Sequence, residues 1–382
     1  MASASNSPVS SSPFQPHWNL YPRTYVVPKI SFPLLDHLDG DLTKDVWKDV
    51  PFSDVFDDIR GATDSPAEDR PNPQCRTRFK AVWDETHLYI GAILQSDFET
   101  QAHFAERNAP IFQKDSDFEV FVDMFGSCHH YKELEVNAIN TPWNLMLDKP
   151  YDDGGVEHSG RIAKPGDDLY YEVEHQKTAT KVISGKLNDP KNPATWSIEV
   201  ALSYRDLLAH VKGKEHFVAK SGSMLRINFS RVEKRGAINW TWQPQIVWDP
   251  HRRRYAGYVA MHLPDSWGYF VLGGQHHARE NNPNDLVAPK DPSWPGRLAA
   301  MNIYYAQKAY SQQNGGTYAT TVTELTDLVD AIILEPFRVE INLTKEGYVA
   351  SLAGNPDGSI VTVRQDRLLS IAQIDQVTSS TG

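Results

Sequence analysis

The sequence predicts an all-β protein, an immunoglobulin-like or jelly-roll β-sandwich that is followed by a small C-terminal α+β domain. Apolar and polar residues alternate with a period of two along many short segments, as they do in half-buried strands. The chain is rich in aromatic residues that suit strands, with 10 Trp, 16 Tyr and 15 Phe. Its 25 Pro and 23 Gly residues punctuate these segments as turns.

Composition narrows the class of protein further. At roughly 150 residues per domain, 382 residues suggest two or three domains. A hydrophobic fraction of 40% and a charged fraction of 23% are typical of globular chains and exclude wholesale disorder. The formal net charge of −11 argues against nucleic-acid binding, which needs clustered Lys and Arg. No apolar run of about 18 residues predicts a membrane span.

The two cysteines, Cys75 and Cys128, exclude a disulfide framework and a cysteine-built zinc site. One disulfide and two free thiols both remain open. Residues 1–29 are expected to form a disordered tail, because the first dozen are rich in serine. This segment has no apolar region of the kind that a secretory signal needs. The compartment stays unknown, with the cytoplasm as the default expectation and an organelle-transit segment as the alternative.

Residues 30–275 are expected to form the sandwich. Residues 78–83 and 88–94 predict a hairpin whose second strand is buried on both faces. Residues 204–211 suggest one short helix. Further strands are predicted from alternation at residues 118–123, 131–139, 196–202 and 225–231.

Residues 276–295 contain Gly, Asn and Pro clusters that predict a linker. Beyond it, Leu298, Met301, Tyr305 and Ala309 recur at helical spacing, and the Gly pair at 315–316 is a stop signal. A second short helix is predicted near residue 323. Strands are predicted at residues 337–343, 348–352 and 359–364, so residues 296–382 should form the small α+β domain.

A polar row is predicted on one face of the strand at 131–139. Glu133, Glu135 and Asn137 alternate there, with neighbours roughly 6.6–6.8 Å apart. Such a row suits hydrogen bonds to sugar hydroxyls or a cation, and it is equally compatible with a solvated face. Glycoside hydrolysis needs two carboxyls that flank the scissile bond from opposite sides, which two side chains on one strand do not provide.

An acidic segment nearby is a candidate for structural calcium. Asp115, Asp117, Glu119 and Asp123 offer the hard oxygen ligands that calcium takes. They lack the glycine and the spacing of an EF-hand loop, and a turn followed by a strand explains them as well. No phosphate-binding loop, serine nucleophile elbow, cysteine nucleophile signature or zinc spacing of histidines occurs, so no catalytic residue is assigned.

Aromatic residues are the candidates for a ligand platform, because an indole has apolar faces and a polar rim. Trp143 lies beside Asn and Thr in a stretch that resembles a loop, which favours contact with a ligand. Trp240 and Trp242 share one face of a predicted strand. All three tryptophans are also compatible with positions in the hydrophobic core.

Five motifs, in the same order, resemble those of the family 9 carbohydrate-binding modules, over about residues 30–275. They lie at residues 38–47, 82–90, 117–123, 131–137 and 261–269. The resemblance implies a β-sandwich that binds sugars at chain ends between two Trp rings, with calcium in some members. The extra loops and the added C-terminal segment are more similar to the stand-alone members of this superfamily.

The resemblance also implies roles for individual residues. Glu119 matches the family's strand carboxylate that bonds to the sugar. Phe112 and His262 lie near the positions where the family has its two stacking tryptophans, and Glu135 stands where the family has an arginine. The chain therefore departs from the family pattern at both stacking positions.

The leading hypothesis is non-catalytic binding of a plant- or microbial-type polysaccharide or oligosaccharide. Two other classes stay open. One is an O-glycosyl hydrolase that uses Glu119 and Glu135 from neighbouring strands, and the other is a protein-interaction scaffold whose contact surface is the C-terminal domain. The predicted ligand-binding residues are Phe112, Glu119, Glu135, Asn137, Trp143, Trp242 and His262.

Overall fold

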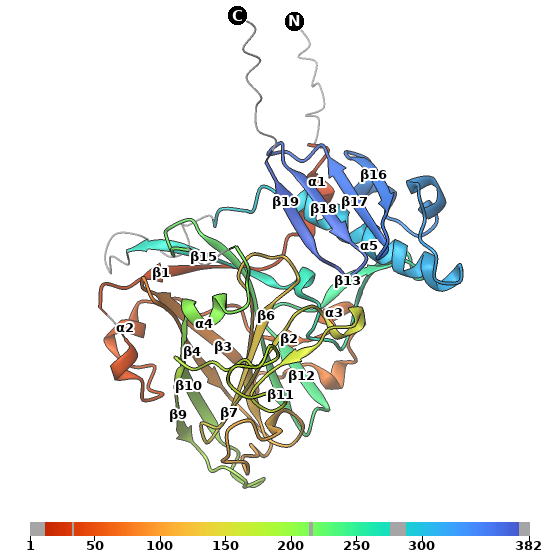
Figure 1. The fold of residues 1–382 in the computed structure, drawn as a ribbon. Helices are drawn as coiled ribbons and strands as arrows, with labels where there is room; N and C mark the ends of the chain where they lie inside the picture. Colours follow the sequence, from red (N-terminus) through yellow and green to blue (C-terminus); the bar gives the residue numbers. More distant parts are fainter. Residues whose placement is uncertain (1–11, 33, 214–216, 276–287, 374–382) are drawn as a thin grey trace, which may run out of the picture.

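The computed structural model describes residues 12–32, 34–213, 217–275 and 288–373 (Figure 1). Within these ranges the predicted β-sandwich and the small C-terminal α+β unit are both present. Among the described residues, no helix is long and apolar enough to cross a membrane. Cys75 and Cys128 are both buried free thiols.

The sandwich is one large sheet that folds back over itself. Its strands run in the order β8-β7-β6-β5-β11-β15-β1-β3-β4-β10-β9, and β12 and β2 extend it from β11. Neighbours are antiparallel except β1, which runs parallel to β15 and β3. The strands are β1 (Thr24–Lys29), β2 (Asp57–Asp58), β3 (Thr77–Trp83), β4 (His87–Leu94), β5 (Asp117–Asp123), β6 (Tyr131–Asn137), β7 (Pro142–Leu147), β8 (Glu157–His158), β9 (Lys177–Ser184), β10 (Thr195–Ser203), β11 (Met224–Glu233), β12 (Ile238–Thr241) and β15 (Gly268–Gln275).

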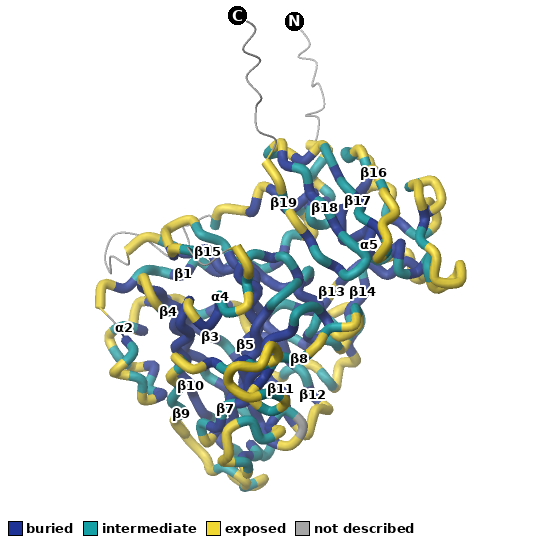
Figure 2. The backbone as a smooth tube through the Cα atoms, viewed as in Figure 1, coloured by how far each residue is buried: buried dark blue, intermediate teal, exposed yellow. Residues whose placement is uncertain are grey.

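The two layers enclose the main hydrophobic core. Alternate residues of each strand point into it, as Phe118 and Val120 do on β5. The Phe79 ring lies near its centre, 4.3 Å from Phe229 and 5.2 Å from Trp242 between ring centroids. Figure 2 shows the buried backbone of β5 and β11 in the interior and the exposed edge strand β9.

A short helical segment outside the sandwich covers the outer face of β3, β4 and β10. It contains η1 (Leu35–His37) and α2 (Asp45–Lys48). The buried Trp47 indole donates to Glu199 on β10 at 2.7 Å, and the backbone N–H of Gly40 donates to the same carboxylate at 2.8 Å. Gly40 has φ +80°, and a Cβ there would lie 2.7 Å from the backbone of Thr180. The motif at residues 38–47 is therefore a structural clamp on β10.

The C-terminal unit consists of a helix that packs on an antiparallel sheet. α5 (Trp294–Gln313) lies against β17 and β18, and its small buried residues Ala299 and Ala306 allow close approach. The predicted helix and strands of this unit are present. The unit also contains η7 (Val322–Leu325), α6 (Ala331–Leu334), β16 (Arg338–Leu343), β17 (Tyr348–Ala353), β18 (Ile360–Arg364) and β19 (Leu369–Ala372).

The expectation of a disordered tail over residues 1–29 is wrong for its described part. Residues 1–11 lie outside the described residues, but α1 (Gln15–Asn19) and β1 are ordered. His17 Nε2 lies 2.9 Å from the Ile333 carbonyl oxygen, and the Trp294 indole donates to the His17 carbonyl at 2.9 Å. The first described helix, α1, thus lies on the C-terminal unit, and the chain then enters the sandwich at β1 (Figure 1). Most of the predicted linker, residues 276–287, also lies outside the described residues.

A buried arginine forms ion pairs between the two units. Arg367, between β18 and β19, donates to Asp153 at 2.8 Å and to Asp265 at 2.9 Å. Both aspartates belong to loops of the sandwich. The remaining short elements are α3 (Gly61–Asp64), η2 (Ala67–Asp69), η3 (Ile111–Gln113), η4 (Tyr151–Asp153), α4 (Tyr204–Leu208), β13 (Ile246–Asp249), β14 (Arg254–Gly257) and η5 (Pro264–Ser266).

Candidate functional site

The candidate site lies on the outer face of β5, β6 and β7, away from the main core. Antiparallel register places Glu119 opposite Glu135 and Glu135 opposite Trp143. In the next row, Phe121 lies opposite Glu133. Because strand side chains alternate between faces, these residues all project to the same side. Three glutamates therefore form an acidic floor, defined here as Glu119, Glu133 and Glu135.

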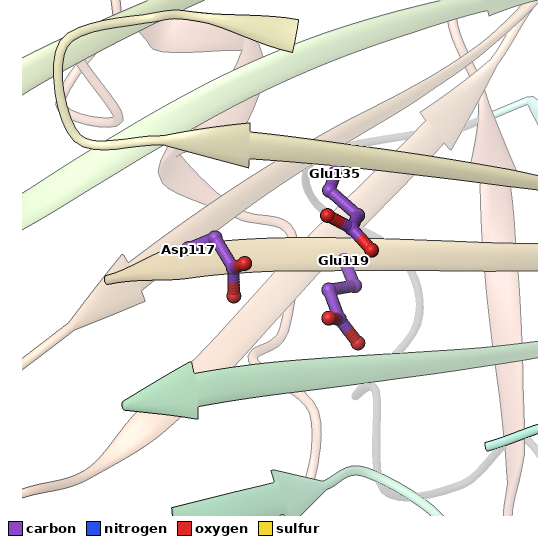
Figure 3. A group of neighbouring side chains, drawn as sticks. All are labelled: Asp117, Glu119 and Glu135. Atoms are coloured by element: carbon purple, nitrogen blue, oxygen red, sulfur yellow. The ribbon is translucent and has the colours of Figure 1, made fainter. Parts of the chain in front are cut away.

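The acidic floor and the adjacent Asp117 are buried. One oxygen from each of Asp117, Glu119 and Glu135 lies within 4.8 Å of the others. Figure 3 shows the three carboxyl groups close together, with Asp117 and Glu119 on β5 and Glu135 on β6. Among the described residues, no Lys, Arg or His forms an ion pair with any of these three.

Burial raises the pKa of every one of these carboxyl groups, and repulsion between neighbouring carboxylates adds to the effect. The pKa of Glu119 rises to about 8, and Glu133 adds to the effect of burial. The pKa of Glu133 rises to about 7, mainly through burial. Burial and then Glu119 hold the pKa values of Asp117 and Glu135 well above their usual range. The group therefore cannot carry its full negative charge at neutral pH without a ligand.

Aromatic rings border the floor at one end. The Phe112 ring, on η3, lies 5.2 Å from the Trp143 ring between centroids. The guanidinium of Arg161 lies over the Trp143 ring at 3.8 Å and pairs with Glu157 at 2.5 Å. Phe112 and Trp143 thus lie beside the row that holds Glu135.

A second aromatic group borders the other row. The His262 ring lies 6.0 Å from Phe121 and 4.8 Å from the exposed Tyr151 between ring centroids. Its Nδ1 is 2.9 Å from the Tyr131 hydroxyl oxygen. Burial lowers the pKa of His262 to about 4, so this ring is neutral at physiological pH. The acidic floor therefore lies between two sets of rings.

The structure brings six of the seven predicted site residues onto this face: Phe112, Glu119, Glu135, Asn137, Trp143 and His262. Trp143 is on strand β7 and is buried, so its expected place in a loop is wrong. The residues that sequence reasoning missed are Tyr131, Tyr151 and Arg161. Tyr131 follows the same alternation as Glu133 and could have been found, whereas Tyr151 and Arg161 belong to a long connection after β7 whose docking has no local signal.

Two of the seven predicted residues are held by contacts within the protein. Trp242 is only 1% exposed and packs in the main core beside Phe79, so it cannot stack on a ligand. Asn137 is buried at the end of β6, where it donates to the Phe104 carbonyl at 2.8 Å and accepts from the Thr141 N–H at 2.8 Å. Its amide holds the local turn together.

The acidic segment that was a calcium candidate is divided by the fold. Asp115 accepts the backbone N–H groups of His103 and Phe104, at 2.9 and 3.0 Å. Asp123 accepts the Cys128 N–H at 2.7 Å. These two carboxylates therefore hold the loops at the ends of β5, and Asp117 and Glu119 are the members of the segment that lie in the cluster with Glu135.

No protein-family model matches this chain, and no curated protein matches it. Among solved structures, the chain is similar to a putative carbohydrate-binding protein from Bacteroides uniformis, with 13% identity, 66% of this chain and 99% of that chain covered, and a TM-score of 0.46. It is also similar to a family 9 carbohydrate-binding module from Caldicellulosiruptor kristjanssonii. For the complex of that module with cellotriose, the identity is 15%, the match covers 70% of this chain and 100% of that chain, and the TM-score is 0.38. For the complex with glucose, the identity is 16%, the match covers 70% of this chain and 100% of that chain, and the TM-score is 0.39. Family 9 modules, which the sequence motifs resemble, are thus among the solved structures similar to this chain.

Proposed function

We propose that the protein binds carbohydrate, without catalysing a reaction on it, at the outer face of β5, β6 and β7. The observation that carries the proposal is the acidic floor between two sets of aromatic rings. A sugar has an apolar C–H face that stacks on rings and a rim of hydroxyls that hydrogen-bond to carboxyl oxygens. Ligand sites commonly combine an apolar surface with a few placed polar groups in this way.

The charge of the site favours an uncharged glycan. The floor consists of carboxyl groups, and the whole chain has a formal net charge of −11. Phosphorylated sugars and uronic acids would place another negative charge beside carboxyl groups whose ionisation is already opposed by burial and by their neighbours, which disfavours binding. We therefore infer that the ligand is a neutral polysaccharide or oligosaccharide of plant or microbial type.

The arrangement of Glu119 and Glu135 favours binding over hydrolysis. These residues lie directly opposite each other on adjacent strands and project from the same face. Glycosidases place their two carboxyls on opposite sides of the scissile bond. A pair that approaches the sugar from one side can hold hydroxyls, but it does not provide an acid and a nucleophile across a glycosidic bond.

The test is calorimetry of the full chain against a panel of neutral oligosaccharides that includes cellotriose and xylo-oligosaccharides. We expect saturable binding to at least one of them and no new reducing ends after overnight incubation. Phe112→Ala and Tyr151→Ala should each weaken binding by at least about tenfold, which corresponds to about 1.4 kcal/mol. Phe32→Ala, an exposed ring on the other layer, is the matched control.

Three outcomes would overturn the proposal. Absence of binding across the panel would favour the interaction scaffold. Wild-type affinity of both Phe112→Ala and Tyr151→Ala would move the site elsewhere. Release of reducing ends would replace binding by hydrolysis and direct attention to Glu119 and Glu135.

A further inference from the structure

Several carboxyl oxygens at the acidic floor have no partner. Asp117 Oδ2, Glu133 Oε2 and Glu135 Oε2 are buried and form no hydrogen bond. Buried polar atoms are almost always hydrogen-bonded, because an unpaired one destabilises the folded state and a charged one does so more strongly. Two of these oxygens, on Asp117 and Glu135, lie in one cluster with the Glu119 carboxyl group, where a positively charged ligand would satisfy them.

The oxygens are close enough to one another to contact one ion. Oxygens of Asp117, Glu119 and Glu135 lie within 4.8 Å of one another. Calcium binds oxygen at about 2.3–2.6 Å, so two ligands on opposite sides of the ion are about 4.6–5.2 Å apart. Magnesium usually keeps several waters and is held by one or two carboxylates, so a set of three carboxylates favours calcium.

The backbone holds these three side chains in place. Asp117 and Glu119 are two residues apart on β5, and Glu135 lies opposite Glu119 on β6 (Figure 3). Strand pairing on both sides of β5 and β6 fixes the Cα positions. The donor set is therefore preorganised, and its hard carboxylate oxygens are the ligands that alkaline-earth cations prefer.

We propose that Asp117, Glu119 and Glu135 bind one divalent cation, Ca²⁺, through their carboxylate oxygens. Three carboxylates supply at least three of the six to eight oxygens that calcium takes, and the remaining positions are open to water or to other hydroxyl oxygens. This proposal goes beyond the proposed function, because the cation site needs no glycan to form.

The first measurement is metal binding by the full chain after EDTA treatment and dialysis. Titration with CaCl₂ should show one site per chain, with Mg²⁺ binding at least about tenfold more weakly. Saturating Ca²⁺ should raise the melting temperature by about 3 °C, since a ligand that binds only the native state stabilises it.

The calcium affinity of variants distinguishes a cation site from a group of carboxyl side chains that share protons. Glu135→Gln and, as a second variant, Asp117→Asn should each weaken calcium binding by at least about 100-fold. Glu172→Gln is the control, because its carboxylate is held by Arg107 at 2.8 Å and by Asn108 at 2.6 Å. Absence of calcium binding by the wild type would overturn the proposal, as would wild-type calcium affinity in both variants.

Glycan titrations of EDTA-treated and calcium-loaded protein distinguish the two proposals. Glycan binding in EDTA without any calcium binding would overturn the cation site and support the proposed function. Calcium binding without glycan binding would support the cation site and overturn the proposed function.

Discussion

Replacement of Arg367 by methionine tests how the C-terminal unit is attached to the sandwich. The Arg367 side chain is 1% exposed, and its guanidinium contacts carboxylates of Asp153 and Asp265 at 2.8 and 2.9 Å. It also donates to the hydroxyls of Tyr304 and Tyr305, both at 3.2 Å. One side chain of the C-terminal unit therefore neutralises two carboxylates of the sandwich.

The expected loss of stability follows from what the substitution leaves behind. The Asp153 and Asp265 side chains are 2% and 5% exposed, so Arg367→Met leaves two carboxylates buried. Removal of one partner of a buried ion pair costs about 3–5 kcal/mol. Lys308 still contacts Asp153 at 3.2 Å, which places the expected loss near the lower end, about 3 kcal/mol.

Urea unfolding followed by tryptophan fluorescence and circular dichroism measures this loss. We expect a new transition at low urea in Arg367→Met, because the C-terminal unit separates before the sandwich unfolds. Arg364→Met is the control: its partly exposed pair with Asp366, at 2.6 Å, should contribute less than about 1 kcal/mol. Equal unfolding curves for the two variants would refute the assigned role of Arg367.

Three further predictions concern the sandwich. Burial lowers the pKa of Lys132 to about 7. Between about pH 7 and 10 the native state therefore binds fewer protons than the unfolded chain, and the cost of burying the charged Lys132 disappears as the pH rises. Lys132→Met should therefore be more favourable to stability at pH 6 than at pH 10 by several kcal/mol in urea unfolding, and an equal effect at both pH values would contradict this. Phe79→Ala should lower the free energy of unfolding by about 3–5 kcal/mol, because its ring is fully buried among other rings; a loss below 1 kcal/mol would contradict the assigned core. Cys75 and Cys128 should resist a thiol reagent in the native protein and react after denaturation, whereas fast native reaction of either would show that it is exposed.

The strands of the sandwich were predictable because their signal is local. Alternation at residues 118–123 and 225–231 identifies β5 and β11, and a turn between two apolar runs identifies the β3 and β4 hairpin. Helical spacing likewise identifies α5. In each case one face of the element is buried, so apolar residues recur in the sequence with the period of the strand or helix.

Other parts of the molecule were not predictable, because tertiary contacts decide them. α1 has five residues, and His17 ties it to Ile333 and Trp294, which lie more than 270 positions away in the sequence. Trp242 has the same local alternation as a surface tryptophan, and only the pairing of distant strands places it in the core. Of the site, alternation predicts the face of Glu133 and Glu135, but the strand register that brings Glu119 opposite Glu135 needs the whole sheet.

Another buried glutamate of the sandwich, Glu199, can be compared with Glu135. Glu199, on β10, accepts hydrogen bonds from Trp47, Lys44 and two backbone N–H groups, so its buried carboxylate is fully satisfied. Glu135 is equally buried on the opposite layer and leaves an oxygen unpaired. On the same strand face as Glu135, β7 carries Leu145 and Leu147, so apolar residues fit this surface. Glu199 thus has four donors, whereas Glu135 has an unpaired oxygen and leucines beside it. The protein therefore keeps the acidic floor at a cost in stability. Departures of this kind from the local rules of folding are expected where a protein binds its ligand.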